Sequence, residues 1–297
     1  MRVLVTGGAG FIGRQVVARL LERGDEVTVV DLKPQADEGV RHVQADLREP
    51  ATVLECLDDG ADAVVHLAAL TRVLDSVKDP DGVFRTNVLG THLILERCRT
   101  LGVPGFVFAS TNAVVGDVGS SVITEEMVLR PLTPYGATKA AGEHLLAAYG
   151  ACYGLHAVAL RFTNVYGRGM QVKDSVIARL MRAALTEGGI QIYGDGSQVR
   201  DYVYVTDVVE AIELALELDR SDTFVIGSGE SVSMLELHRI ACEVTGVEIG
   251  AEHVPGQPGE MPAVVVDNSH AREAGWAPRH DLRAGIEATW KDFLQQS

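Results

Sequence analysis

The sequence has little of what proteins that bind nucleic acid, span membranes or hold metals need. Its 297 residues carry 26 Lys and Arg against 41 Asp and Glu, and this net charge of −15 disfavours nucleic acid and anionic membranes as main partners. The four cysteines are scattered without Cys-x-x-Cys spacing or a neighbouring His cluster, which disfavours a zinc site or a disulfide framework. No apolar stretch approaches a membrane span, and the N-terminus leads directly into a predicted strand. We therefore expect a cytoplasmic protein without a metal, bound neither to a membrane nor to nucleic acid.

The chain does have a regular alternation of short apolar runs and amphipathic segments. The runs predict strands at Val3–Thr6, Glu26–Val30, His42–Ala45, Ala63–Leu67, Gly105–Ala109 and Ala157–Arg161, and the segments between them predict helices at Ala9–Glu22, Pro50–Leu57, Phe84–Arg99 and Tyr135–Tyr149. Buried strands joined by crossover helices indicate an α/β fold with a doubly wound parallel (Rossmann) sheet. After Tyr166 the alternation weakens and Gly-rich and Pro-rich stretches appear. We predict a Rossmann domain over 1–166 and a smaller C-terminal substrate-binding lobe over 167–297, with some elements returning to the first domain.

A glycine-rich motif, TGGAGFIG at Thr6–Gly13, follows the first predicted strand and opens the first predicted helix. In this context it indicates dinucleotide binding, because Gly7 and Gly10 permit a tight turn against a pyrophosphate and Gly13 lets the helix pack closely. Asp31 ends the second predicted strand, at the distance expected for a carboxylate that binds ribose hydroxyls. An acid there repels a 2′-phosphate, so we predict NAD rather than NADP.

Tyr135 and Lys139 lie four residues apart in PYGATK, on a predicted helix. That spacing presents both side chains on one side of the helix. There the ammonium can lower the pKa of the phenol and make a phenolate available to take a proton from an alcohol. Surface neighbours often share this spacing, so the interpretation depends on the rest of the sequence.

Further segments carry a resemblance to a known family. They are Asp46-Leu47, HLAA at His66–Ala69, NVLGT at Asn87–Thr91, RFTNVYG at Arg161–Gly167 and GDGSQVRDYVYVTDVV at Gly194–Val209. With the two motifs above, the chain resembles the extended short-chain dehydrogenases/reductases, and within them the NAD-dependent nucleotide-sugar epimerase and dehydratase group. The resemblance covers nearly the whole chain.

The resemblance implies roles for individual residues. The implied catalytic residues are Thr111, Tyr135 and Lys139. The implied NAD contacts are Gly7, Gly10, Phe11, Ile12, Gly13, Asp31, Asp46, Leu47, Leu67, Ala68, Ala69, Thr71, Asn87, Tyr135, Lys139 and Thr163. The implied substrate contacts are Ser76, Thr111, Asn164, Arg200 and Glu260. Two alternatives stay open: Thr111 as a strand-end cap, and Arg200 in a structural salt bridge to Asp201 or Asp207.

Three departures from the family pattern bear on the reaction. Asn112 and Ala113 stand where the 4,6-dehydratases of this group have an Asp-Glu pair, and neither can act as a general acid or base. Gln257 stands where many relatives have a second phosphate-binding Arg. Arg72 replaces a small residue usual in the sugar-facing loop, which suggests the hypothesis that it binds a carboxylate or phosphate of the substrate. Equal losses on neutral and acidic sugars in an Arg72→Ala variant would contradict that hypothesis, and an Arg pointing to solvent is the alternative.

The resemblance implies an NAD-dependent epimerase of a nucleotide sugar, acting at C4 of a UDP-hexose through a transient 4-keto sugar. Alternatives are an NAD-dependent dehydrogenase or ketoreductase of a sugar or sugar acid, a nucleotide-sugar dehydratase, which Asn112 and Ala113 disfavour, and a dinucleotide-sensing regulator without catalysis. The resemblance also implies a homodimer, with the helix bearing Tyr135 and Lys139 in the contact.

Overall fold

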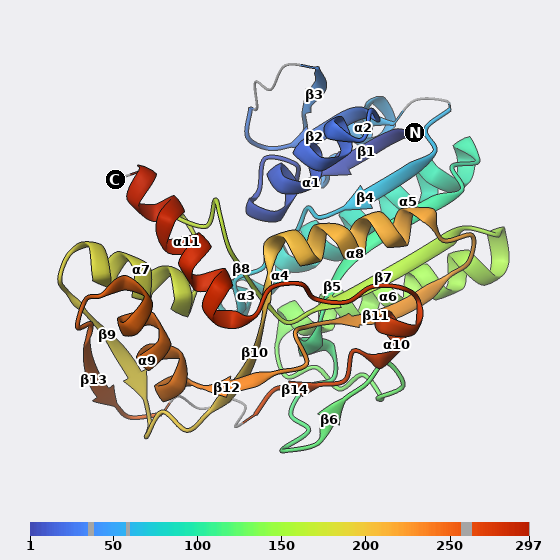
Figure 1. Cartoon of the computed structure of the whole chain (residues 1–297). Coiled ribbons are helices and arrows are strands. Elements are labelled where there is room, and N and C mark those ends of the chain that lie inside the picture. The colour runs from blue at the N-terminus through green and yellow to red at the C-terminus, as the bar shows by residue number, and fades with distance from the viewer. Residues whose placement is uncertain (35–38, 58–59, 257–262, 297) are drawn as a thin grey trace. The chain divides into compact units, whose positions relative to one another are not determined.

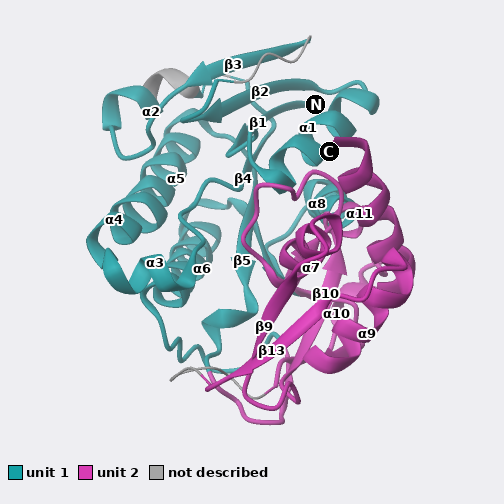
Figure 2. Ribbon diagram, turned by 90° about the vertical axis from the view of Figure 1, so that its left-hand side faces the viewer, with its two compact units in different colours: residues 1–116, 125–161, 209–224 teal, residues 117–124, 162–208, 225–297 magenta. Residues whose placement is uncertain are grey.

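The computed structural model describes residues 1–34, 39–57, 60–256 and 263–296. The chain divides into two compact units (Figure 2). Unit 1 consists of residues 1–116, 125–161 and 209–224, and unit 2 of residues 117–124, 162–208 and 225–297. From the sequence we placed the domain boundary after residue 166, whereas in the structure the chain passes from unit 1 to unit 2 after residue 161. Residues 209–224 then belong to unit 1 again.

A seven-stranded sheet, most of it in unit 1, has the strand order β11-β7-β5-β4-β1-β2-β3 (Figure 1). Its strands are β1 (Arg2–Thr6), β2 (Glu26–Asp31), β3 (Val40–Gln44), β4 (Ala63–His66), β5 (Gly105–Thr111), β7 (His156–Phe162) and β11 (Asp222–Ile226). β1 runs parallel to β2 and β4, and parallel pairing continues to β3 and β5. From β1 the strands follow in chain order to β2 and β3 on one side, and from β4 to β5, β7 and β11 on the other. The predicted doubly wound sheet is therefore confirmed. The carboxyl ends of β1 and β4 mark the switch point at which such sheets bind ligands.

Helices pack on this sheet through apolar side chains. Those of unit 1 are α1 (Phe11–Glu22), α2 (Pro50–Cys56), α3 (Val73–Lys78), α4 (Pro80–Phe84), the π-helix η1 (Arg85–Leu89), α5 (Gly90–Leu101), the 3-10 turn η2 (Asn112–Val114), α6 (Pro134–Tyr153) and most of α8 (Val205–Glu217). A core cluster joins Val64 and Phe106 of the sheet to Ile94 of α5 and Leu146 of α6. Burial of this cluster holds α5 and α6 on the sheet.

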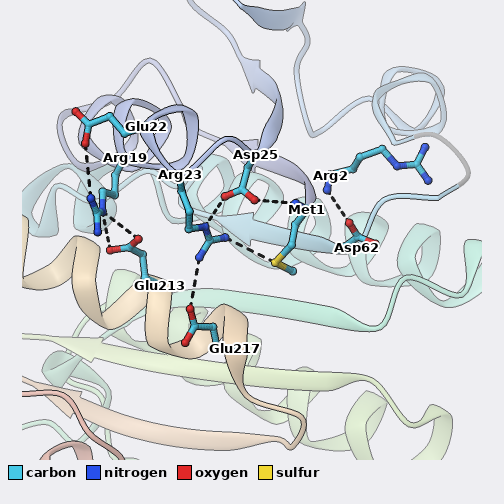
Figure 3. A network of polar contacts seen from close by, with 9 residues as sticks. All are labelled: Met1, Arg2, Arg19, Glu22, Arg23, Asp25, Asp62, Glu213 and Glu217. Atoms are coloured by element: carbon cyan, nitrogen blue, oxygen red, sulfur yellow. Dashed lines mark hydrogen bonds and ion pairs between the residues drawn. The ribbon is translucent and has the colours of Figure 1, made fainter.

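Ion pairs join α1 to α8, which lie far apart in the sequence. Arg19 Nε donates to both carboxylate oxygens of Glu213 at 3.0 and 2.9 Å, and Arg23 Nη1 lies 3.8 Å from Glu217 (Figure 3). Arg23 Nε also donates to Asp25 at 2.6 Å. Exposed pairs contribute little stability each. They nevertheless establish that α1 and α8 are neighbours within unit 1.

The helix expected to carry the catalytic pair, α6, has sequence signals at both ends. Thr133 is its N-cap, since the hydroxyl accepts from Gly136 N at 3.2 Å, and Pro134 occupies the first helical position. Gly154 ends the helix in the left-handed conformation, with φ 71°. The helix predicted here from the sequence is confirmed and extends one turn further.

The single helix predicted over Phe84–Arg99 is instead three segments, α4, η1 and α5. The wide π turn of η1 places Asn87 in a buried position, where its side chain bonds to the backbone of Leu70. Such turns interrupt α-helices most often at functional sites. The helical spacing of the sequence is compatible with either turn, so the sequence alone did not reveal this one.

The described residues of unit 2 form short strands and helices. They are β6 (Val122–Ile123), β8 (Asn164–Tyr166), α7 (Val176–Leu185), β9 (Gly189–Tyr193), β10 (Val199–Tyr204), β12 (Ser231–Ser233), α9 (Met234–Thr245), β13 (Gly250–Val254), β14 (Val265–Val266), α10 (Ser269–Glu273) and α11 (Leu282–Gln296). The strands form the small sheets β12-β10-β8, β13-β9 and β14-β6. Phe293 of α11 is buried. Across the described ranges of both units, none of the helices has the length and apolar character needed to cross a membrane.

Candidate active site

The turn between β1 and α1 requires glycine for steric reasons. Gly7 has φ +72°, and a Cβ there would lie 2.7 Å from Ala68 N. A Cβ at Gly13 would lie 2.2 Å from the carbonyl oxygen of Gly7. Gly10 is the exposed N-cap of α1 and, having no side chain, leaves the first-turn amides available for an anion. The turn therefore fits a pyrophosphate at the N-terminus of α1.

Asp31 is held at the end of β2 by two backbone amides. Its Oδ2 accepts from Ala9 N at 3.1 Å, and its Oδ1 accepts from Lys33 N at 3.0 Å. One carboxylate thus links the glycine-rich turn to the loop after β2. Each oxygen has a further lone pair for a hydroxyl donor, so the position predicted to bind a ribose fits that role.

A buried chain of hydrogen bonds joins the carboxyl ends of β1 and β4 to α5. His66 lies between two threonine hydroxyls, with Nδ1 2.7 Å from Thr6 Oγ1 and Nε2 2.9 Å from Thr91 Oγ1. Thr91 in turn donates to Asn87 O at 2.6 Å. Complete burial lowers the pKa of His66 to about 3, and the charge of Lys139 acts in the same direction. The imidazole is therefore neutral, one nitrogen donating and the other accepting.

Asn87 connects this chain of hydrogen bonds to the loop over residues 67–71, which contains four of the predicted NAD contacts. Its Oδ1 accepts from Leu70 N at 2.8 Å, and its Nδ2 donates to Leu70 O at 3.0 Å and to Thr138 Oγ1 at 3.0 Å. Thr138 donates to Tyr135 O, so the network reaches α6. In the structure Asn87 positions the loop, and the direct cofactor contact implied for it stays a prediction.

The predicted catalytic residues meet where β5 ends against α6. Thr111 Oγ1 accepts from Ala113 N at 3.2 Å, as a strand-end cap, and its hydroxyl also hydrogen-bonds the phenol of Tyr135. The interpretation of Thr111 as a strand-end cap is confirmed, and its catalytic role stays a prediction. Lys139 Nζ donates to Ala109 O at 2.7 Å and lies 4.6 Å from the centre of the Phe108 ring.

Burial moves the pKa values of Tyr135 and Lys139 in opposite directions. Burial raises the pKa of Tyr135 to about 12, against a lowering by the hydrogen bond with Thr111. Burial lowers the pKa of Lys139 to about 7, against a raising by the nearby carboxylate of Glu143. The hydrogen bond with Thr111 lowers the pKa of Tyr135. The lowering that we predict for Lys139 stays a prediction, and its ammonium is directed at the Ala109 carbonyl.

Ser76 and Arg72 flank this site at α3. Ser76 is fully buried, donates to Val73 O at 2.6 Å and accepts from Tyr135 N at 3.2 Å, so it fixes the start of α6. The sugar contact implied for Ser76 stays a prediction. The side chain of Arg72 is 64% exposed and lies 3.4 Å from Asp75, which leaves both interpretations of this residue open.

Asp46 and Leu47, which the family resemblance implies as neighbours of the NAD adenine, differ in their surroundings. Asp46 makes a bidentate contact with Arg48, whose Nε lies 2.9 Å from each carboxylate oxygen. Hydrogen bonds to Arg48 lower the pKa of the Asp46 carboxyl. Leu47 is buried in the core cluster. Any adenine contact from this segment would therefore come from Asp46 and the backbone.

A buried carboxylate, Asp201, lies among the residues of unit 2 that were predicted to contact NAD or the substrate. Asp201 accepts from Thr163 Oγ1 at 2.7 Å and from the amide and hydroxyl of Ser228, and its carbonyl accepts from Asn164 Nδ2 at 2.9 Å. Arg200 Nη1 donates to Val199 O at 2.8 Å. Asp201 thus orders β8, β10 and the loop after β11 around Arg200.

Two residues that the sequence analysis placed near the nucleotide, Glu260 and Gln257, lie outside the described residues. Asp207, the other salt-bridge partner considered for Arg200, has His280 Nδ1 at 2.7 Å. Within the described ranges, no three His, Cys, Asp or Glu side chains are grouped to hold a metal ion.

Sequence reasoning missed three polar residues behind the catalytic pair. Glu143 of α6 pairs with Arg161 of β7 at 2.8 Å and accepts from Ser110 Oγ of β5 at 2.5 Å. Glu143 follows Lys139 by four residues, as Lys139 follows Tyr135. That spacing was a usable signal, whereas the contact with Ser110 and Arg161 depends on the packing of α6 against the sheet.

Fold and site together define an enzyme of the dinucleotide-binding Rossmann class, with a Thr-Tyr-Lys group in the same unit as the nucleotide turn. A model of the NAD dependent epimerase/dehydratase family matches residues 3–227. The chain is 33% identical to a UDP-glucose 4-epimerase of Corynebacterium glutamicum, over 98% of this chain and 95% of that protein. The chain belongs to the NAD dependent epimerase/dehydratase family, which confirms the resemblance, and NAD is its cofactor.

Solved structures agree with this assignment. The UDP-glucose 4-epimerase of Thermus thermophilus, in complex with NAD, is 37% identical with a TM-score of 0.94, over 100% of both chains. The UDP-glucose 4-epimerase of Thermotoga maritima, with UDP-glucose, is 32% identical with a TM-score of 0.96, over 100% of this chain and 99% of that one.

Proposed function

We propose that the protein is an NAD-dependent epimerase that inverts C4 of a UDP-hexose. The observation that carries the proposal is the Thr111–Tyr135 contact, one helical turn from Lys139, in the same unit as the nucleotide turn. Similarity to UDP-glucose 4-epimerases over nearly the whole chain supports it.

In this mechanism Tyr135 takes the proton of the sugar hydroxyl. Thr111 orients that hydroxyl and stabilises the phenolate by donating to its oxygen, the interaction that lowers the pKa of Tyr135. The glycine-rich turn and Asp31 would hold NAD, which when bound would supply reversible hydride transfer at C4 of the sugar. Lys139 adds positive charge beside the nicotinamide ribose, and Arg200 and Asn164 anchor the nucleotide diphosphate. Anchoring at the diphosphate leaves the hexose able to turn over.

The proposal is tested by incubating the protein with UDP-glucose or UDP-galactose and separating the two sugars by chromatography. We expect interconversion with no net NADH absorbance. Net NADH release would favour a dehydrogenase or ketoreductase, and loss of water from the sugar would favour the dehydratase that Asn112 and Ala113 disfavour.

A Tyr135→Phe variant should lower kcat by about 10²- to 10⁴-fold, because it removes the proton acceptor. A Tyr193→Phe variant is the matched control, since Tyr193 lies on β9 of unit 2 and outside the proposed catalytic group. Full activity of Tyr135→Phe would contradict the proposed chemistry, and unchanged biological activity without catalysis would favour the regulator.

We also propose a homodimer in which a second copy covers α5 and α6. Leu89, immediately before α5, and Tyr153, at the end of α6, are 41% and 57% exposed. Large apolar and aromatic side chains exposed along adjacent helices favour a partner surface.

A further inference from the structure

A polar stripe on α6, consisting of Tyr135, Lys139 and Glu143, faces the end of β5. The three residues are spaced by four, so they lie on one side of the helix. Lys139 Nζ donates to the carbonyl of Ala109, and Glu143 accepts from the hydroxyl of the next residue, Ser110, at 2.5 Å. Ala109 and Ser110, which are neighbours on β5, thus bind Lys139 and Glu143 of the stripe.

Glu143 is fixed from a second direction by Arg161 of β7. Arg161 Nε lies 3.0 Å from one carboxylate oxygen and Nη2 lies 2.8 Å from the other, and Nη1 donates to Glu125 O at 2.9 Å. The side chains of Arg161 and Glu143 are 5% and 7% exposed. A buried pair of this kind is costly to desolvate and is poor evidence for a purely stabilising role. Its carboxylate is a fixed negative charge one turn from Lys139.

The charged and titratable groups around Lys139 come from its own helix and from two strands of the sheet. They are Tyr135 and Glu143 of α6, His66 of β4 and Arg161 of β7. His66 is neutral, because its pKa is lowered to about 3. Burial lowers the pKa of Lys139, and Glu143 is the group that raises it. In a medium of low polarity such a charge acts strongly.

We propose that Glu143 is a positioning residue of this site: held by Ser110 and Arg161, its carboxylate keeps the Lys139 side chain protonated and directed at Ala109. Without that charge, burial would favour the neutral amine, which neither attracts an anionic phenolate nor donates three hydrogen bonds. The relevance of this charge to the reaction rests on the function proposed above, but the charge itself can be measured separately.

The test is a pH titration of Lys139 by nuclear magnetic resonance of lysine labelled with carbon-13 at Cε. The chain has only five lysines, Lys33, Lys78, Lys139, Lys173 and Lys291, so the Lys139→Arg spectrum assigns the signal. Glu143→Gln should lower the titration midpoint of Lys139 by about one pH unit or more. Glu143→Asp retains the charge and is the matched control, with a midpoint close to that of the parent protein.

A second variant, Arg161→Gln, changes the net charge near Lys139 in the opposite direction from Glu143→Gln. Arg161→Gln removes a buried cation and should raise the midpoint of Lys139. Near-ultraviolet circular dichroism shows whether each variant is folded. If Glu143→Gln fails to fold, the Arg161→Gln titration still tests the proposal. An unchanged or raised midpoint in folded Glu143→Gln protein, or an unchanged or lowered one in Arg161→Gln protein, would overturn the proposal.

The alkaline limb of kcat/KM gives a separate readout. If protonated Lys139 is needed, Glu143→Gln should move that limb to lower pH, whereas a merely structural loss would lower the rate at every pH. A shifted lysine midpoint together with full activity of Tyr135→Phe would mean that the proposed function fails while this inference stands.

Discussion

At the scale of single residues, burial sets the protonation of the site. Lys139 is 3% exposed and Tyr135 is half-buried. For both residues, the main cause of the pKa shift is the loss of water around the polar atom of the side chain. A hydrogen bond with Thr111 opposes that effect at Tyr135, and the carboxylate of Glu143 opposes it at Lys139. Two consequences can be measured on single residues.

The first concerns stability against pH. The pKa of Lys139 is about 7 in the folded protein against 10.5 as its ordinary value, so between these limits the unfolded chain binds more protons. The contribution of Lys139 to unfolding free energy therefore rises with pH across this window. Urea unfolding of the parent protein and of Lys139→Met should show a difference that grows in favour of the parent from about pH 7 to about pH 10. A constant difference would contradict a depressed lysine pKa.

The second concerns the choice of dinucleotide. Asp31→Asn should weaken NAD binding about tenfold, because the variant loses charge-assisted hydrogen bonds to the ribose. It should also reduce the protein's preference for NAD over NADP, because the variant no longer repels a 2′-phosphate. Fluorescence titration with both dinucleotides measures the ratio. Asp62→Asn, which alters a carboxylate that accepts from Arg2 N, is the control. An unchanged ratio in Asp31→Asn would contradict the ribose role.

At the scale of elements, the close approach of α6 to β5 creates the site. Gly142, between Lys139 and Glu143, makes it possible, because a Cβ there would lie 2.5 Å from the Phe108 ring. That ring lies beneath the Lys139 ammonium. A larger residue on this face would separate the polar stripe from the strand that holds it.

Gly142→Ala should accordingly destabilise the protein by about 1–3 kcal/mol, less the ~1 kcal/mol that Ala gains in helix propensity. Thermal or urea unfolding measures the net loss. Adding Phe108→Leu should recover part of it, because the clash involves that ring. Strict additivity of the two changes would contradict a direct contact.

At the scale of the whole molecule, the prediction from sequence succeeded where the signal is local. Runs such as Val3–Thr6 and the capped helix α6 follow from periodicity and end signals. Strand β11 and helix α8 were not predicted, because their places beside β7 and α1 depend on partners distant in sequence. Within the site, Thr111, Tyr135 and Lys139 came from motifs. Glu143 did not, since its role arises only through Ser110 and Arg161.

The proposed homodimer is also a property of the whole molecule. Leu89→Glu should weaken a dimer by about 2 kcal/mol or more, about 30-fold in Kd, because it places a charge in an apolar contact. Analytical ultracentrifugation over a range of concentrations measures the change. Leu235→Glu, on α9 of unit 2, is the control, since Leu235 is 47% exposed there. A parent protein that sediments as a monomer would contradict the dimer.

The placement of β11 at the edge of the main sheet has a consequence for biosynthesis. β7 ends at residue 162, but its neighbour on that side, β11, begins only at residue 222. A nascent chain therefore emerges from the ribosome with an unpaired strand edge while some sixty intervening residues are still being translated. During that interval the growing chain is most exposed to aggregation, and chaperone binding would be of greatest use there.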